Sequence, residues 1–99
     1  MTQEIKEKAL AAFLKSPYWK GIYEKAPANA KKFYEVVFAN SENLISQEEH
    51  VSSVHEIYGQ FDDADWEYVI ENTQNEMAKW GYKKAREKFG KKNSNESAR

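Results

Sequence analysis

The sequence predicts an all-α protein, a compact four- to five-helix bundle followed by a disordered polar C-terminal tail. No stretch alternates apolar and polar residues with the β-branched side chains that a half-buried strand requires. The chain holds 4 Gly and 2 Pro, and each lies near a point where the apolar period changes, so these residues mark helix boundaries. Between them, apolar side chains recur at the three- and four-residue intervals of amphipathic helices.

The first two helices are predicted over residues 2–15 and 16–26. Thr2 can cap the first helix, whose apolar side chains gather on one side. The dipeptide Ser16-Pro17 is typical of a helix start, with serine as the N-cap and proline at the first helical position. The second helix is expected to end before the next proline, because that ring pushes the preceding residue out of the α region.

A third helix over residues 27–39 is predicted to be the most buried one. Its apolar side chains follow the i, i+3, i+4, i+7, i+8 pattern of a core-facing stripe: Ala30, Phe33, Tyr34, Val37 and Phe38. Only Lys31, Lys32 and Glu35 face clearly away from that stripe. Residues 40–43 are predicted to form a loop.

The fourth helix is predicted over residues 46–59. Ser46 and Glu49 have the spacing of a capping box, in which the serine hydroxyl accepts from the Glu49 amide and the Glu49 carboxylate reaches back. Gly59 is expected to end this helix. Its inward-facing side chains are Val51, Val54, His55 and Tyr58.

The last predicted helix is long and runs from an aspartate cap, Asp62 or Asp63, to Gly90. Its narrow apolar stripe consists of Trp66, Val69, Ile70, Thr73, Met77 and Trp80. Gly81 continues the stripe without a side chain, which indicates either a close helix approach or a break. Residues 1–90 then form a single helical domain, and residues 91–99 a flexible tail. The core is predicted to contain Phe13, Trp19, Ile22, Phe33, Val37, Val51, Val54, Tyr58, Trp66, Ile70, Met77 and Trp80.

The composition excludes several classes of protein. The chain has no cysteine, which excludes a disulfide scaffold, thiolate catalysis and zinc or iron–sulfur sites built on Cys. The absence of cysteine is also compatible with the cytoplasm, where we expect the protein. The longest apolar run, Ala9 to Leu14, is too short for a membrane span, so we expect no membrane association.

Neither metal binding nor catalysis is indicated by any motif. His50 and His55 are five residues apart, so a regular helix cannot direct both at one metal. We expect His55 to be a hydrogen-bonded core residue and His50 to be solvated. The acidic run from Asp62 to Asp65 lacks the ligand spacing and the central glycine of a calcium loop. Because nucleophile, phosphate-loop and zinc-helix motifs are also missing, we expect no cofactor, no metal and no enzymatic activity.

Charge is distributed in blocks along the chain. Residues 1–40 hold seven Lys and four Glu, for a net charge of +3. Residues 41–77 hold ten acidic residues and no Lys or Arg, for a net charge of -10, and residues 78–99 carry +6. The overall charge of -1 therefore hides strongly charged segments.

The acidic segment predicts a binding surface for a basic protein partner. An inhibitor whose carboxylates imitate nucleic-acid phosphates would present such a surface. The residues assigned to this surface are Glu56, Asp62, Asp63, Asp65, Glu67 and Glu71. A purely structural explanation stays open, because acidic residues at the start of a helix and basic residues at its end complement the helix dipole. Basic segments can also neutralise an acidic one inside a bundle.

Two other functions are compatible with the sequence. The basic segment from Lys79 to Lys92 could contact a nucleic-acid backbone. The residues assigned to this contact are Lys79, Lys83, Lys84, Arg86 and Lys88. Three aromatic residues, Tyr68, Tyr82 and Phe89, lie off the stripe of the last helix. They predict either a partner surface, including that of a homodimeric helical module, or rings covered by the first helix or by the C-terminal tail.

Overall fold

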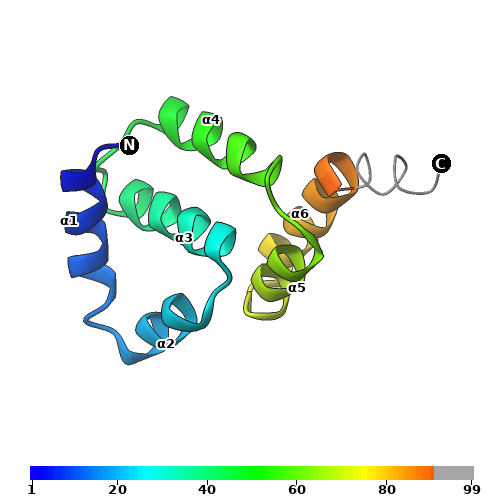
Figure 1. The fold of residues 1–99 in the computed structure, drawn as a ribbon, viewed down its shortest axis with the longest axis horizontal. Coiled ribbons are helices and arrows are strands. Elements are labelled where there is room, and N and C mark those ends of the chain that lie inside the picture. The colour runs from blue at the N-terminus through cyan, green and yellow to red at the C-terminus, as the bar shows by residue number, and fades with distance from the viewer. Residues whose placement is uncertain (91–99) are drawn as a thin grey trace.

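The computed structural model describes residues 1–90, which form six α-helices followed by a π-helical turn and contain no strand (Figure 1). The elements are α1 (Gln3–Phe13), α2 (Pro17–Lys25), α3 (Ala28–Ser41), α4 (Gln47–Tyr58), α5 (Asp63–Glu71), α6 (Glu76–Ala85) and the turn η1 (Arg86–Gly90). The predicted all-α class is confirmed, but the described residues contain six helices instead of four to five. The tail expected over residues 91–99 lies outside the described residues.

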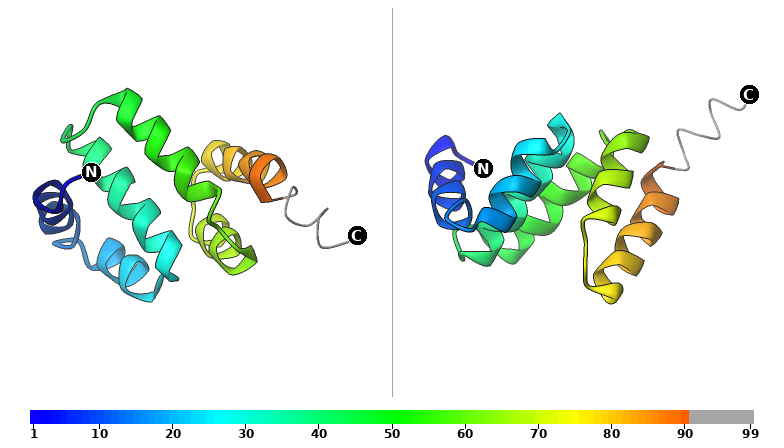
Figure 2. Two further views of the ribbon diagram at one scale, coloured as in Figure 1. Left: turned by 45° about the horizontal axis from the view of Figure 1, so that its top comes forward. Right: turned by 90° about the horizontal axis from the view of Figure 1, so that it is seen from below.

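Helix α3 is the centre of the fold. It packs against α1, α2, α4 and α5. Figures 1 and 2 show α1, α2 and α4 arranged around α3, with α5 and α6 at the opposite end of the molecule from α1. Seven of its residues are buried, more than in any other helix of the described chain, so the prediction that it is the most buried helix is confirmed.

The helix starts follow the capping signals of the sequence. The side-chain oxygens of Thr2, Ser16 and Ser46 each accept a hydrogen bond from a backbone amide three residues ahead, at 3.1–3.5 Å. The reciprocal half of the predicted box at Ser46 is replaced by an ion pair, because the Glu49 carboxylate lies 3.5 Å from the amine of Met1. A complete capping box occurs instead at α5, between Asp62 and Asp65.

Helix α3 extends to Ser41 and ends in a tight turn, where the sequence predicted a loop from residue 40. Asn43 adopts a left-handed conformation with φ of 58°. The Leu44 amide donates to the Ala39 carbonyl at 2.9 Å, and the Asn43 amide donates to the Asn40 carbonyl at 3.1 Å. This pair of bonds satisfies the last carbonyls of the helix, and asparagine tolerates the left-handed backbone better than most residues.

The predicted long last helix is wrong, because the chain breaks between α5 and α6. The Asn72 and Thr73 side chains donate to backbone carbonyls of α5 at 2.9 and 2.6 Å, and Asn75 accepts from the Ala78 amide at 3.0 Å. Side-chain bonds of this kind compete with a continuous helix. Gly81 causes no break, since α6 runs through it, and nothing lies within 4 Å of where its Cβ would be.

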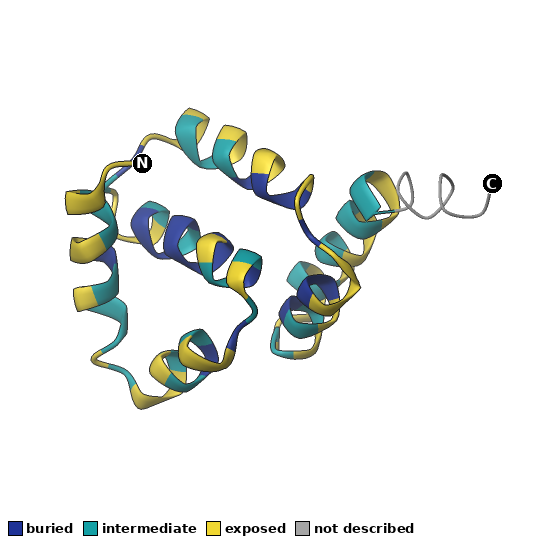
Figure 3. Ribbon diagram, in the orientation of Figure 1, coloured by how far each residue is buried: buried dark blue, intermediate teal, exposed yellow. Residues whose placement is uncertain are grey.

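The core is aromatic, and its largest fully buried side chain is Trp66, which is 1% exposed and packs against Tyr58 and Phe61 at ring-centroid distances of 5.0 and 4.8 Å. Most predicted core residues are buried or packed against this cluster: Phe13, Trp19, Ile22, Phe33, Val37, Val54, Tyr58, Trp66 and Ile70. Figure 3 shows the buried positions along α3 and in α5.

Three predicted core residues are exposed: Val51, Met77 and Trp80. Met77 is 80% exposed and Trp80 is 61% exposed. Because the break re-aims the chain, the apolar stripe of α6 no longer continues that of α5, and α6 contains no buried residue. Glu35, predicted to face away, is buried in α3 at 7% exposure.

Candidate functional site

The exposed acidic residues of α5 form a row along one side of the helix. Asp63, Glu67 and Glu71 are spaced at intervals of four residues, so they lie on one face, and all three are exposed. We call these three residues the α5 acidic row. Asp62, the N-cap of α5, and Glu56, on the last part of α4, are also exposed.

Asp65 does not belong to this surface, and its assignment to a partner site is corrected. Its side chain is part of the capping box, accepting from the Asp62 amide at 2.9 Å, and the residue is 2% exposed. Asn29 donates to the same Asp65 oxygen at 3.5 Å from α3. Asp65 therefore ties the start of α5 to the core, and a partner cannot reach it.

Part of the acidic charge is neutralised inside the chain. The Asp63 carboxylate lies 3.1 Å from the Arg86 guanidinium of η1, and Glu49 pairs with the amine of Met1. Within residues 1–90, the other exposed acidic residues of the segment form no ion pair: Glu42, Glu48, Glu56, Asp62, Glu67, Glu71 and Glu76. Pairing within residues 1–90 thus accounts for a minority of the segment's negative charge.

The helix dipole explains the acidic residues at the start of α5 but not those at its end. Carboxylates are favoured near a helix N-terminus and disfavoured near its C-terminus. Glu71 is the last residue of α5, whose last turn contains no basic residue. Glu67 and Glu71 also repel each other at i, i+4 spacing. The break at residues 72–75 separates both from the lysines that one continuous helix would have placed after them. Helix stability therefore does not account for this pair.

The three off-stripe aromatic residues are covered by the core of the same chain. The Tyr68 hydroxyl donates to the Ile22 carbonyl at 2.6 Å. The rings of Tyr82 and Phe33 meet edge to face at 5.6 Å, and Phe89 lies 5.5 Å from Tyr58. Burial raises the pKa of both Tyr68 and Tyr82. Packing within residues 1–90 thus accounts for these rings, and the contacts come from α2, α3 and α4 instead of the first helix.

The predicted basic residues lie on α6 and η1: Lys79, Lys83, Lys84, Arg86 and Lys88. Arg86 is held by Asp63, and the Lys84 ammonium lies 3.3 Å from the Glu87 carboxylate. The same ammonium lies 5.6 Å from the centroid of the exposed Trp80 ring. The basic end therefore presents an exposed tryptophan among lysines.

The two histidines have the reverse of their predicted environments. His55 is exposed and rests against Phe89, with 5.4 Å between ring centroids. His50 is partly buried, and its Nδ1 atom is inaccessible and makes no hydrogen bond within residues 1–90. The stripe of α4 is rotated relative to the prediction, so that Ile57, which the prediction omitted, faces the core.

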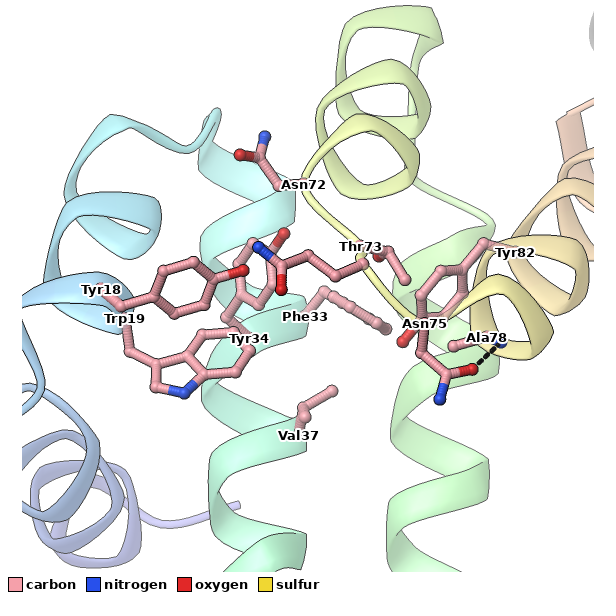
Figure 4. Close-up of a pocket in the computed structure, with 11 residues that line it drawn as sticks. Tyr18, Trp19, Phe33, Tyr34, Val37, Asn72, Thr73, Asn75, Ala78 and Tyr82 are labelled. Atoms are coloured by element: carbon pink, nitrogen blue, oxygen red, sulfur yellow. Dashed lines mark hydrogen bonds between the residues drawn. The ribbon is translucent and has the colours of Figure 1, made fainter.

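An aromatic pocket of about 310 Å³ opens between α2, α3 and the chain that joins α5 to α6. Figure 4 shows Tyr18 and Trp19 on one side, Asn75 and Tyr82 on the other, and the α3 side chains between them. Its complete lining is Tyr18, Trp19, Phe33, Tyr34, Val37, Asn72, Thr73, Gln74, Asn75, Ala78 and Tyr82. None of the residues that line it within residues 1–90 is charged.

Sequence reasoning missed this pocket. One available signal was Tyr18, which lies next to Trp19 but off the stripe of α2. The other was the polar run at residues 72–75, which was interpreted as the interior of a helix. Helix periodicity locates residues that face a core, but it does not show where two helices diverge and leave a hollow between them.

Residues 1–90 hold neither a candidate metal site nor a candidate membrane span. No group of three or more His, Asp or Glu side chains within residues 1–90 could hold a metal ion together. In the same range, no helix combines the length and the apolar character needed to cross a membrane. Comparisons of the chain with protein-family models, with curated proteins and with solved structures found no match.

Proposed function

We propose that this protein is a small, non-enzymatic binding protein whose acidic helical surface engages a basic protein partner. The α5 acidic row makes the contact, and Glu67 and Glu71 are its main residues. Glu56 and Asp62, which precede the row in the chain, also take part. A partner that ordinarily binds nucleic-acid phosphates has the complementary charge, so inhibition of such a protein is one form of this function.

The observation that carries the proposal is the position of Glu67 and Glu71 at the middle and at the end of α5. Both are exposed, and neither forms an ion pair within residues 1–90. The two carboxylates repel each other, and Glu71, the last residue of α5, also opposes the helix dipole. A basic partner would relieve this repulsion, and its binding would therefore be strengthened by charge that the isolated helix disfavours.

The test is charge reversal at these two positions. Anisotropy measurements with a labelled oligolysine peptide should show that Glu67→Lys combined with Glu71→Lys weakens binding by about tenfold or more, since like charges then face each other. The matched control combines Glu7→Lys with Glu24→Lys, which changes the net charge equally at exposed positions outside the acidic segment. Equal weakening by both pairs would show that net charge alone attracts the peptide, and it would contradict the proposal.

One observation favours a second candidate function, binding of single-stranded nucleic acid through α6. Trp80 is exposed among Lys79, Lys83 and Lys84, and aromatic side chains interleaved with bases can stack on nucleobases while lysines contact phosphates. A gel shift with a single-stranded oligonucleotide at low salt should then show binding that Trp80→Ala reduces. Absence of binding at low salt would remove this candidate.

A further inference from the structure

A groove crosses α3 next to residues 72–75, which lie near the C-terminal end of the acidic segment. The aromatic pocket shares Phe33, Val37 and Tyr82 with a second hollow of about 170 Å³, which extends to His50 and Tyr58 of α4. The two hollows together run from α2 across α3 to α4. Two adjacent hollows that share side chains can take successive residues of one extended segment of chain.

The lining specifies the chemistry of an occupant. Five aromatic rings and no charged side chain face the aromatic pocket, so the part of a ligand that enters it is apolar and uncharged. The hydrogen bond from the Ala78 amide occupies Asn75 Oδ1 and directs the amide NH2 of Asn75 elsewhere as a donor. With the Gln74 amide, the Tyr18 hydroxyl and the Trp19 indole, the pocket offers donors suited to backbone carbonyls.

We propose that this groove binds an extended, proline-rich segment of the partner in the polyproline II conformation. Such a segment has free backbone carbonyls and presents proline rings that pack on tyrosine and tryptophan. Two other peptide modes fit less well. Residues 1–90 contain no strand whose edge a β-segment could extend, and a helix has already paired the carbonyls that the pocket donors would meet.

The charge beside the pocket specifies the flanking residues of this segment. Glu71 and Glu76 are exposed and lie directly before and after residues 72–75, which form one wall of the pocket. A lysine or arginine next to the prolines would meet these carboxylates. The basic flank rests on the proposed function, since it assigns the segment to the same basic partner, whereas the proline contacts depend on the groove alone.

The test uses the full-length chain and three labelled peptides of equal charge. The first contains prolines and leucine between lysines, the second replaces those residues by glycine and serine, and the third is an amphipathic helix. Fluorescence anisotropy should show tightest binding of the proline-rich peptide. Tyr18→Ala and Gln74→Ala should each weaken that binding by about tenfold while leaving the glycine–serine peptide unaffected.

Two controls separate loss of the groove from loss of the fold. Tyr18 is 46% exposed, so its truncation should leave the urea midpoint unchanged. Tyr18→Phe keeps the ring and removes only the hydroxyl donor, so it should recover most of the binding that Tyr18→Ala loses. A Trp19 indole N–H resonance that shifts on addition of the proline-rich peptide would place the peptide in the pocket.

The outcomes also distinguish this proposal from the proposed function. If the proline-rich and glycine–serine peptides bind equally, and both are lost with Glu67→Lys and Glu71→Lys, the groove proposal is overturned and the acidic row stands. If the proline-rich peptide binds with unchanged affinity after that charge reversal, the groove stands and the acidic row falls. Tighter binding of the helical peptide, or concentration-dependent self-association that Tyr18→Ala abolishes, would also overturn the groove proposal.

Discussion

The Tyr23 hydroxyl donates a hydrogen bond of 2.5 Å to the carboxylate of Glu35, which is buried in α3. The Lys6 ammonium lies 3.6 Å from the same oxygen, so side chains of α1 and α2 both reach a charge on the central helix. Burial, followed by the hydrogen bond to Glu35, raises the pKa of Tyr23. A polar contact thus joins three helices whose other contacts are mainly apolar.

Loss of this hydroxyl should destabilise the fold. We expect Tyr23→Phe to lower the free energy of unfolding by about 1.5–3 kcal/mol, because it removes a hydrogen bond to a buried charged group. Urea denaturation at pH 7 measures the change. Tyr18→Phe, at an exposed position, is the matched control and should leave the midpoint in place. Equal midpoints for both variants would show that Glu35 does not need the Tyr23 hydroxyl.

The two tryptophans that the sequence placed on one stripe should differ strongly in their effect on stability. Trp66 is 1% exposed and Trp80 is 61% exposed. We expect Trp66→Ala to cost about 3–5 kcal/mol by leaving a cavity in the core, and Trp80→Ala to change stability by less than about 0.5 kcal/mol. Thermal or urea unfolding separates the two. A large loss of stability for Trp80→Ala would contradict the exposed position of this residue. It would instead support the continuous helix that the sequence predicted in place of α5 and α6.

The cap at the start of α6 should contribute measurably to stability. Asn75→Ala removes the side-chain acceptor for the Ala78 amide, and we expect a loss of about 1 kcal/mol, with a small decrease in helical circular dichroism. Gln74→Ala is the neighbouring control and should have little effect on either signal. If Asn75→Ala increased the helical signal, residues 72–75 would be joining the two helices instead of separating them.

Stability should decline at alkaline pH. Burial raises the pKa of Tyr34 above its ordinary value of 10.0, so above that pH the folded state holds a proton that the unfolded chain releases. The free energy of unfolding then falls as pH rises, by up to about 1.4 kcal/mol per pH unit for each such tyrosine. Tyr34→Phe should reduce this slope between about pH 10 and 11 and leave it unchanged below pH 9. Identical slopes in both proteins would contradict this assignment.

The fold was predictable where local chemistry determines it. Residues close together in the sequence determine the caps at Thr2, Ser16 and Ser46 and the apolar stripe of α3. The structure confirms these predictions. The break after Glu71 was not predictable from periodicity, since the apolar spacing from Trp66 to Trp80 continues through it. The hydrogen bonds of the intervening polar side chains decide against one long helix. They join residues three or four apart, and the Asn75 cap is of the same kind as those at Thr2 and Ser16, but the continuous apolar spacing outweighed this signal in the prediction.

The candidate site was predictable only in part, for a similar reason. Net charge along the chain indicated the acidic segment, but not that Asp65 is used inside a capping box or that Asp63 meets Arg86. Burial of Glu35 also escaped prediction, because its partner Tyr23 lies on another helix. Contacts between helices, such as those of Asp63 with Arg86 and of Glu35 with Tyr23, cannot be derived from spacing along one helix.

The most direct test of the central claim neutralises Glu67 and Glu71 and measures stability and binding on the same protein. We expect Glu67→Gln combined with Glu71→Gln to raise the free energy of unfolding by about 0.3–1 kcal/mol. The pair removes the mutual repulsion of the two carboxylates and the unfavourable interaction of Glu71 with the helix dipole. The same pair should weaken binding of the basic peptide. A loss of stability with unchanged binding would show that these carboxylates stabilise the fold, and it would contradict the proposal that they bind a basic partner.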